Sequence, residues 1–492
     1  MNVAEAVMAK ETELKLAIPL RAQELIRQHP ILRQAKSYDK TLLQNTYFDT
    51  PDLVLNRAKV ALRIRKSGER YIQTLKTQGK GNGGLHQRGE WEWVLKQNKL
   101  DLSLIDPDLW PNAIDPAYLQ KHLAPVFETN FTRDRWLLDV SFEDSRAEVE
   151  LACDNGHAIA NKQRDPISEI ELELVSGDAE LIFKIAHDLS AQIPLMISNI
   201  SKAQRGFRLS HPVAAGLAPR KPAPPTSWLT LVQLAQFELD QFIAAKDQLN
   251  FDHQWSRLTT MSQSLFQIRW CLYQLHGLSE QSTLRPPAVM TYKLRMLNYG
   301  FENLAAIENQ QQAWQRLKNC PDKLRQAADF MVLNEQYQKL ILEPWVGETL
   351  LEITQLLYLF AKEPKAKAVK STDDVFHNLL VAVKLPSHPT DRHQWLQQSP
   401  AILRLSRWIS YHDLDQTGLG TKALQKDCLL LINKAAELRG LMAEEWTIRN
   451  ELPEAQQPAL LKRTEEDQYQ KVLELGRIAL SFNSLQDNLR HY

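Results

Sequence analysis

The sequence lacks an excess of either charge. Its 492 residues contain 59 basic side chains (Lys and Arg) and 59 acidic ones (Asp and Glu), so the formal net charge is zero. Non-specific binding to nucleic acid draws on a surplus of basic side chains, and this composition gives no reason to expect it. A binding site for an anion must therefore be built locally, from charges that the fold brings together.

Cysteine is scarce, and long apolar runs are missing. The four cysteines lie far apart and form no CxxC pair: Cys153, Cys271, Cys320 and Cys428. This spacing argues against a disulfide framework or a zinc ribbon and fits a reducing compartment. No uncharged stretch approaches the roughly 18–20 residues of a membrane span. Lys10, Glu11 and Glu13 interrupt the first segment, which is unlike a signal peptide. We expect a cytoplasmic protein without a membrane partner.

Several common catalytic motifs are also missing from the sequence. It contains no GxSxG elbow, no P-loop and no HExxH motif. Residues 79–84 match GxGxxG, but a dinucleotide site needs a helix after these glycines. Residues 85–96 have the pattern of a strand, so we predict that the glycines close a hairpin.

What the sequence does contain is charge in strict alternation. Glu11, Glu13 and Lys15 alternate with Thr12 and Leu14, and a strand would place the three charges on one face. The same spacing recurs along the chain at Arg63 and Arg65; Arg88, Glu90 and Glu92; Arg133 and Arg135; Glu148 and Glu150; and Glu169, Glu171 and Glu173. A sheet that repeatedly directs both signs to one face encloses a polar interior. Acidic clusters there suit hard divalent cations, and basic clusters suit phosphate groups.

The first two fifths of the chain are predicted to be mostly strands. We expect strands at 11–18, 42–48, 58–66, 70–77, 85–96, 126–132, 133–142, 146–153, 157–164 and 167–175. Asp154-Asn155-Gly156 is predicted to form a tight turn, which gives Asp154 a structural role. A helix is expected at 19–34 and another at 178–193. About eight antiparallel strands can close into a barrel and so remove exposed edges.

The rest of the chain is predicted to be helical. Prolines at 212–225 indicate a semi-rigid linker, 212–227, between a first domain (1–211) and a second (228–492). Beyond the linker, apolar residues recur at helical spacing with breaks at prolines, Pro400 among them. The fold class is therefore α+β: an N-terminal eight-stranded antiparallel barrel with flanking helices, then an all-α bundle.

The ordered motifs resemble the CYTH superfamily of triphosphate tunnel metalloenzymes. The resemblance runs from Glu11-x-Glu13-x-Lys15 to Ser201-Lys202 and rests on motifs that follow one another in order. Between the two ends these are Tyr47-Phe48-Asp49-Thr50, Leu62-Arg63-Ile64-Arg65, Thr74-Leu75-Lys76, Arg88-Gly89-Glu90, Glu148-Val149-Glu150 and Glu169-Ile170-Glu171-Leu172-Glu173. It implies a topologically closed tunnel. The layout of the whole chain resembles bacterial inorganic triphosphatases, in which a CYTH domain precedes a helical CHAD domain.

Chemistry and the resemblance together give candidate site residues. For binding the phosphate groups these are Lys15, Arg63, Arg65, Lys76, Arg133, Arg135 and Lys202. Among them, Lys15, Arg63 and Lys76 are expected to take part in catalysis. For holding Mg²⁺ or Mn²⁺, the candidates are Glu11, Glu13, Glu148, Glu150, Glu171 and Glu173.

The leading hypothesis is a metal-dependent hydrolase of inorganic triphosphate. An adenylate cyclase, a nucleoside or thiamine triphosphatase, and a polyphosphate-binding scaffold remain as alternatives. CHAD domains bind polyphosphate through basic helices, but residues 252–263 carry few cations, which favours an interaction or stabilising role for the helical half. Because every charged motif precedes Pro212, we expect residues 1–211 alone to keep most of the activity.

Overall fold

The computed structural model describes residues 9–77, 80–82, 85–111, 114–212, 227–278, 285–316, 331–363, 372–386, 391–411 and 421–490. The chain divides into two compact units. The first comprises Met1–Pro219, Ile243–His253 and Ile341–Leu356. The second comprises Arg220–Phe242, Gln254–Leu340 and Leu357–Tyr492. The first unit thus includes two segments that lie within the helical part of the sequence.

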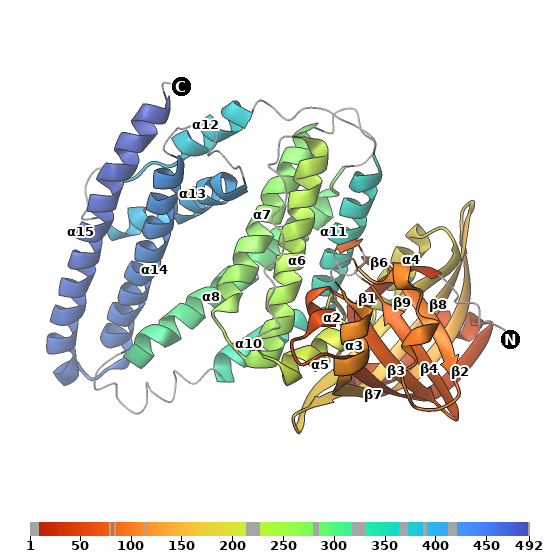
Figure 1. Ribbon diagram of the computed structural model, residues 1–492. Coiled ribbons are helices and arrows are strands. Elements are labelled where there is room, and N and C mark those ends of the chain that lie inside the picture. The colour runs from red at the N-terminus through yellow and green to blue at the C-terminus, as the bar shows by residue number, and fades with distance from the viewer. Residues whose placement is uncertain are drawn as a thin grey trace. The chain divides into compact units, whose positions relative to one another are not determined.

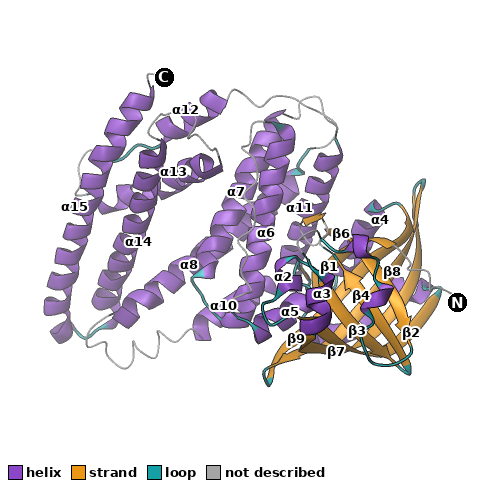
Figure 2. Ribbon diagram, viewed as in Figure 1, coloured by secondary structure: helices purple, strands orange, loops and turns teal. Residues whose placement is uncertain are grey.

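One antiparallel sheet forms the centre of the first unit (Figures 1 and 2). Its strands are β1 (Ala9–Ala17), β2 (Ser37–Asp49), β3 (Ala61–Ser67), β4 (Arg70–Lys76), β5 (Lys80–Asn82), β6 (Leu85–Leu95), β7 (Ala124–Phe142), β8 (Ser145–Ala160), β9 (Gln163–Gly177) and β10 (Met196–Ile197). Strand β5 pairs with the start of β6, as expected for a hairpin here, while Gly79, Gly83 and Gly84 lie outside the described residues.

The sheet nearly returns on itself. The strand order is β10-β1-β9-β8-β7-β2-β3-β4-β6-β5, with an additional pairing of β1 with β6. Strand β1 pairs with β6 through residues 9–14 and with β9 through residues 13–17, so both pairings coincide only at Glu13 and Leu14. The predicted antiparallel sheet with flanking helices is confirmed. A barrel of eight strands closed along its whole height is not, because ten strands take part and the junction is this short.

Two predicted strand breaks were wrong. Residues 126–142 belong to the single strand β7, and residues 146–160 to the single strand β8. Asp154-Asn155-Gly156 therefore forms no turn, although its composition favours one locally. The pairing of β8 with both β7 and β9 along this stretch outweighs that preference. Gly156 suits the strand because a Cβ there would meet Asn130 O at 2.1 Å and Phe131 Cα at 2.5 Å.

The predicted helix over 19–34 is also divided. The structure has a 3-10 turn at Leu20–Ala22, α1 (Gln23–Gln28) and a second 3-10 turn at Pro30–Gln34. Pro30 explains the break, because proline disfavours helical geometry in the residue before it, and His29 is extended (φ −65°, ψ 134°). The remaining helices of this region are α2 (Val54–Arg57), α3 (Pro116–His122), α4 (Glu180–Ser190) and α5 (Lys202–Ser210).

Apolar packing covers the outer face of the sheet beside β1 and β7–β9. On β1, Leu14 and Leu16 are fully buried on the face opposite Glu13 and Lys15. Helix α4 contacts β7, β8 and β9, and its Ile182 and Ile185 are completely buried. Apolar packing on this outer face leaves the alternate, charged positions directed to the inner face.

The second unit is helical throughout its described residues. The helices of the C-terminal part are α6 (Trp228–Asp252), α7 (Arg257–Leu278), α8 (Ala288–Arg316), α10 (Met331–Ile341), α11 (Pro344–Lys362), α12 (Thr372–Ala382), α13 (Arg392–Tyr411), α14 (Thr421–Glu451) and α15 (Gln457–Arg490). The all-α prediction is confirmed for this region. No helix among the described residues has the length and apolar character needed to cross a membrane.

One predicted helix break, Pro400, was wrong. Helix α13 continues through Pro400. A proline inside a helix removes one hydrogen bond. Here Trp395, Ile402, Leu405 and Trp408 on both sides of it are buried in one apolar core, and that packing keeps the helix continuous.

Candidate active site

Strand register explains how charges from distant motifs come together. Glu13 on β1 lies opposite Glu173 on β9, and Glu173 lies opposite Glu150 on β8. Two residues further along β1, Lys15 lies opposite Glu171 on β9. These residues share one face because each is an even number of positions from its neighbour in the motif. The alternation in the sequence therefore becomes rows of charge across adjacent strands.

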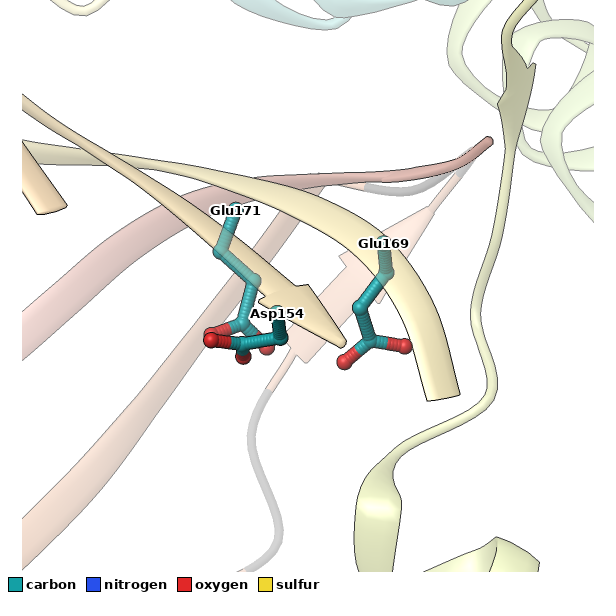
Figure 3. Close-up of side chains that lie close together, drawn as sticks. All are labelled: Asp154, Glu169 and Glu171. Carbon is teal, nitrogen blue, oxygen red and sulfur yellow. The ribbon is translucent and has the colours of Figure 1, made fainter. Parts of the chain in front are cut away.

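Three carboxylates form the centre of the site (Figure 3). Asp154 on β8 and Glu169 and Glu171 on β9 each offer an oxygen, and these oxygens lie within 4.8 Å of one another. Asp154 and Glu169 have no exposed surface. We call these three residues the carboxylate cluster.

Three cations neutralise the carboxylate cluster. Lys202 Nζ lies 2.7 Å from Asp154, 2.6 Å from Glu169 and 2.9 Å from Glu171. Lys15 Nζ donates to Glu169 at 3.3 Å and also to Glu171. Arg133 makes two hydrogen bonds to Asp154, at 2.8 and 2.7 Å, and contacts Glu171.

Electrostatics keeps Glu169 and Glu171 of the carboxylate cluster ionised. Burial alone would raise the pKa of Glu171, but Lys15, Lys202 and Arg133 together lower it well below its usual value. The same balance holds for Glu169: burial alone would raise its pKa, but Lys15 and Lys202 lower it to about 2. Three carboxylates that already have three cations as partners have little need of a further positive charge.

Helix α5 places Lys202 beside the carboxylate cluster. Ser201 caps this helix, since its hydroxyl accepts from Gln204 N at 3.1 Å while Gln204 Oε1 accepts from Ser201 N at 2.7 Å. This reciprocal arrangement fixes where the helix begins, and Lys202 is its first residue.

A group of arginines comes from β3 and β7. Arg63 on β3 donates to Tyr47 Oη and to Glu90, each at 3.3 Å. Arg65 donates to Asn45 Oδ1 at 3.1 Å, and the carboxylate of Glu92 is 4.0 Å from its guanidinium. We use "arginine group" for Arg63, Arg65 and Arg133.

Within the arginine group, the surroundings of Arg65 disfavour its positive charge. Burial, together with the nearby charges of Arg63 and Arg133, lowers the pKa of Arg65 to about 10. In addition, Arg63 Nε is buried without a hydrogen-bond partner among the described residues. Buried donors are almost always paired, so this geometry leaves a place for an anionic acceptor.

A second set of carboxylates includes one, Glu173, whose negative charge is disfavoured by its surroundings. We call Glu13, Glu150 and Glu173 the acidic row. Burial and the charge of Glu150 raise the pKa of Glu173 to about 7; Lys76 opposes this shift, and Glu13 and Glu90 add to it. Glu150 lies 3.6 Å from the guanidinium of Arg135. Like charges held together in this way favour a bound cation.

Not every predicted residue lies at this centre. The side chain of Arg135 is 48% exposed and lies 3.4 Å from Asp39. Glu148 pairs with Lys36 at 3.0 Å. Lys76 pairs with Glu90. The side chain of Glu11 lies outside the described residues, although its backbone pairs with β6.

Sequence reasoning missed two central carboxylates. Asp154 was expected in a turn, and Glu169 was not among the expected ligands. The available signal was register: Asp154 on β8 lies directly opposite both Arg133 and Glu169. Reading β8 as one strand would have placed Asp154 on the same face as Glu150, four residues earlier.

Comparison with known proteins finds relatives of the first part of the chain. Residues 9–207 match the CYTH domain family. An inorganic triphosphatase of Haemophilus influenzae is 36% identical over 205 residues, which are 42% of this chain and 56% of that protein. The match thus spans little more than half of the relative's length.

Two solved structures also resemble this chain. One is a Hippeastrum protein assigned as an adenylyl cyclase in which triphosphatase activity dominates: 20% identity, TM-score 0.31, covering 42% of this chain and 98% of that one. The other, from Bacillus halodurans, is assigned as an adenylate cyclase: 25% identity, TM-score 0.26, covering 41% and 98%. The similarity to the CYTH domain family rests on the match over residues 9–207.

Proposed function

We propose that this protein is a metal-dependent inorganic triphosphatase, which hydrolyses triphosphate to pyrophosphate and phosphate. One observation carries the proposal: Arg65, whose charge is disfavoured by burial and by Arg63 and Arg133, lies in the same sheet as Glu173, whose charge is disfavoured by burial and by Glu150. A chain of phosphates bound with divalent cations supplies both missing charges. The substrate's name rests on the triphosphatase relative.

The two acidic sets differ in how well they fit a metal ion. The carboxylate cluster is already neutralised by Lys15, Lys202 and Arg133. The acidic row has oxygen donors of the kind that Mg²⁺ and Mn²⁺ prefer, and it holds Glu173 at a raised pKa because of burial and Glu150. We therefore favour Glu13, Glu150 and Glu173 as the residues that hold the metal, whereas Glu11, Glu148 and Glu171 have weaker support.

The metal would polarise phosphoryl oxygens and orient the attacking water. This chain's own residues would do the rest. Arg63 and Arg65 would bind phosphate oxygens, for which the planar guanidinium is suited to paired contacts. Lys15, Lys76 and Lys202 would add point charges, each held in place by a carboxylate. Arg133 would act with both the arginines and the lysines in binding phosphate oxygens, because Asp154 fixes the position of its guanidinium.

The remaining assignments are also proposals. We propose a CHAD-like, stabilising or interacting role for the helical domain, with polyphosphate as a weaker ligand candidate, and a cytoplasmic location. The division into 1–211, a linker at 212–227 and 228–492 stays a prediction; residues 213–226 lie outside the described residues.

Phosphate release from inorganic triphosphate, ATP, thiamine triphosphate and long polyphosphate, with and without Mg²⁺, tests the proposal. Inorganic triphosphate should give the highest kcat/KM, because adenosine adds bulk without adding charged partners. A chelator of divalent cations should abolish turnover. Full activity in excess chelator would contradict the mechanism, and cyclic AMP as the main product from ATP would favour the cyclase alternative.

A further inference from the structure

A short segment of α6 reaches the site from the helical part of the sequence. Residues Ile243–His253 belong to the first compact unit, although they follow the CYTH match by more than thirty residues. We propose that this segment is a positioning element: it fixes the backbone beside Lys15 and the helix that carries Lys202. The kinetic test of this proposal rests on the proposed function. The structural part of the proposal rests on the contacts described below.

The first connection leads to Lys15. The ammonium of Lys246 donates to Ile197 O at 3.1 Å and lies 3.0 Å from Asp247 Oδ1. Ser198 Oγ donates to Asp247 Oδ2 at 3.2 Å. Ser198 in turn contacts Lys15 directly, since Ser198 N donates to Lys15 O at 3.1 Å. Two adjacent residues of α6 thus hold the backbone that holds Lys15.

The second connection leads to Lys202. Arg208 on α5 donates to Asp247 O at 3.3 Å, and its guanidinium lies 4.2 Å from the ring of Phe251. The same guanidinium donates to the buried Asp165 at 2.8 Å. Arg208 therefore fastens α5 to α6 and to β9 at once, six residues from Lys202.

The chemistry of Lys246 makes it the sharpest test of this element. Its side chain is 2% exposed, and a buried ammonium is tolerated only when its hydrogen bonds are made in fixed geometry. Lys246→Met keeps the length of the side chain but removes the donor to Ile197. The matched control is Gln248→Ala, because Gln248 donates within its own helix, to Asp252 at 3.1 Å.

Hydrogen exchange in the full chain provides a readout that is independent of activity. Amides of residues 196–210 should exchange at least about threefold faster in Lys246→Met than in the wild type, while Gln248→Ala should leave them unchanged. Unchanged exchange in Lys246→Met would overturn the proposal. If the wild type hydrolyses no triphosphate, the proposed function fails, and this measurement alone judges the positioning element.

Kinetics then distinguishes positioning from a merely structural role. Below the melting transition, Lys246→Met should raise KM for triphosphate and lower kcat/KM about tenfold, whereas partial unfolding would reduce the active fraction and leave KM unchanged. In a Lys15→Ala background, the loss from Lys246→Met should shrink below about threefold, because Lys246 acts on the site through Ile197 and Ser198, which hold the backbone of Lys15. Equal losses in both backgrounds would overturn the proposal. If Lys246→Met fails to fold, Ser198→Ala takes its place under the same criteria.

Discussion

At the scale of single residues, the site combines two opposite shortages of charge. Arg65 stands near Arg63 and Arg133 with the Glu92 carboxylate 4.0 Å away, and Glu173 stands near Glu13 and Glu150. The lowered pKa of Arg65 and the raised pKa of Glu173 mean that the charged form of each side chain is disfavoured where it lies. On the proposed function, the charged motifs of the sheet serve a ligand that carries both charges rather than salt bridges within the sheet.

Arg65→Ala should lower kcat/KM for triphosphate at least about 10²-fold, because a charge-assisted contact in a water-poor site contributes roughly 3 kcal/mol. Arg63→Ala should do the same. Arg21→Ala is the matched control, since Arg21 is exposed on the 3-10 turn after β1. Steady-state kinetics of phosphate release checks the prediction. Equal losses at all three positions would mean that position on the strand does not decide which arginines bind substrate.

The raised pKa of Glu173 predicts a pH-dependent metal requirement. Burial and Glu150 hold this pKa at about 7 without a metal, so protons compete with the metal below pH 7. The metal concentration for half-maximal activity should be about tenfold higher at pH 6 than at pH 8, as one competing proton requires. Titration of activity with Mg²⁺ at both pH values measures this. In Glu173→Gln, activity should be nearly lost, and any remaining metal dependence should not change with pH across this range.

At the scale of elements, the sequence predicted that most of the strands exist, but it misplaced several of the residues at which they begin and end. Alternation identified β1, β3, β6 and β9, because one face of each is mainly apolar and the other mainly charged. Local turn chemistry misled at Asp154-Asn155-Gly156, where pairing on both sides keeps the strand extended. Tertiary packing likewise carried α13 through Pro400. Errors arose where long-range contacts outweighed short-range preference.

Gly156 provides a test of this close strand pairing. Gly156→Ala should lower the free energy of unfolding by about 1–3 kcal/mol, because the new Cβ would meet backbone atoms at 2.1–2.5 Å. Gly440→Ala in α14 is the contrasting variant. Beyond its own stretch of helix, a Cβ there would have no heavy atom of the described residues within 4 Å, and alanine should stabilise the helix by about 0.5–1 kcal/mol. Denaturant unfolding of both variants and of the wild type measures these changes in the free energy of unfolding. A neutral Gly156→Ala would show that β7 and β8 separate easily here.

At the scale of the whole molecule, the two compact units do not follow the order of the sequence. Helical periodicity correctly indicates α6 and α11, but it cannot indicate that residues 243–253 and 341–356 cluster with the sheet. That information lies in contacts such as Lys246 with Ile197, and His187 with Gln355 at 3.0 Å. Gly347 of α11 also lies against Leu195, where a Cβ would meet the carbonyl oxygen at 1.8 Å.

These contacts change what truncation should do. From sequence alone, residues 1–211 should keep most of the activity, since they include every charged motif. The structure adds that such a fragment lacks two segments of the first compact unit, and with them the partners of Ile197, Ser198 and Arg208. We now expect the fragment to melt at a lower temperature than the first transition of the full chain and to lose at least about tenfold in kcat/KM, a loss comparable to that of removing one buried contact. Circular dichroism and phosphate release, measured side by side on the fragment and the full chain, test both parts. A fragment with full activity and an unchanged melt would show that the sheet positions Lys15 and Lys202 unaided.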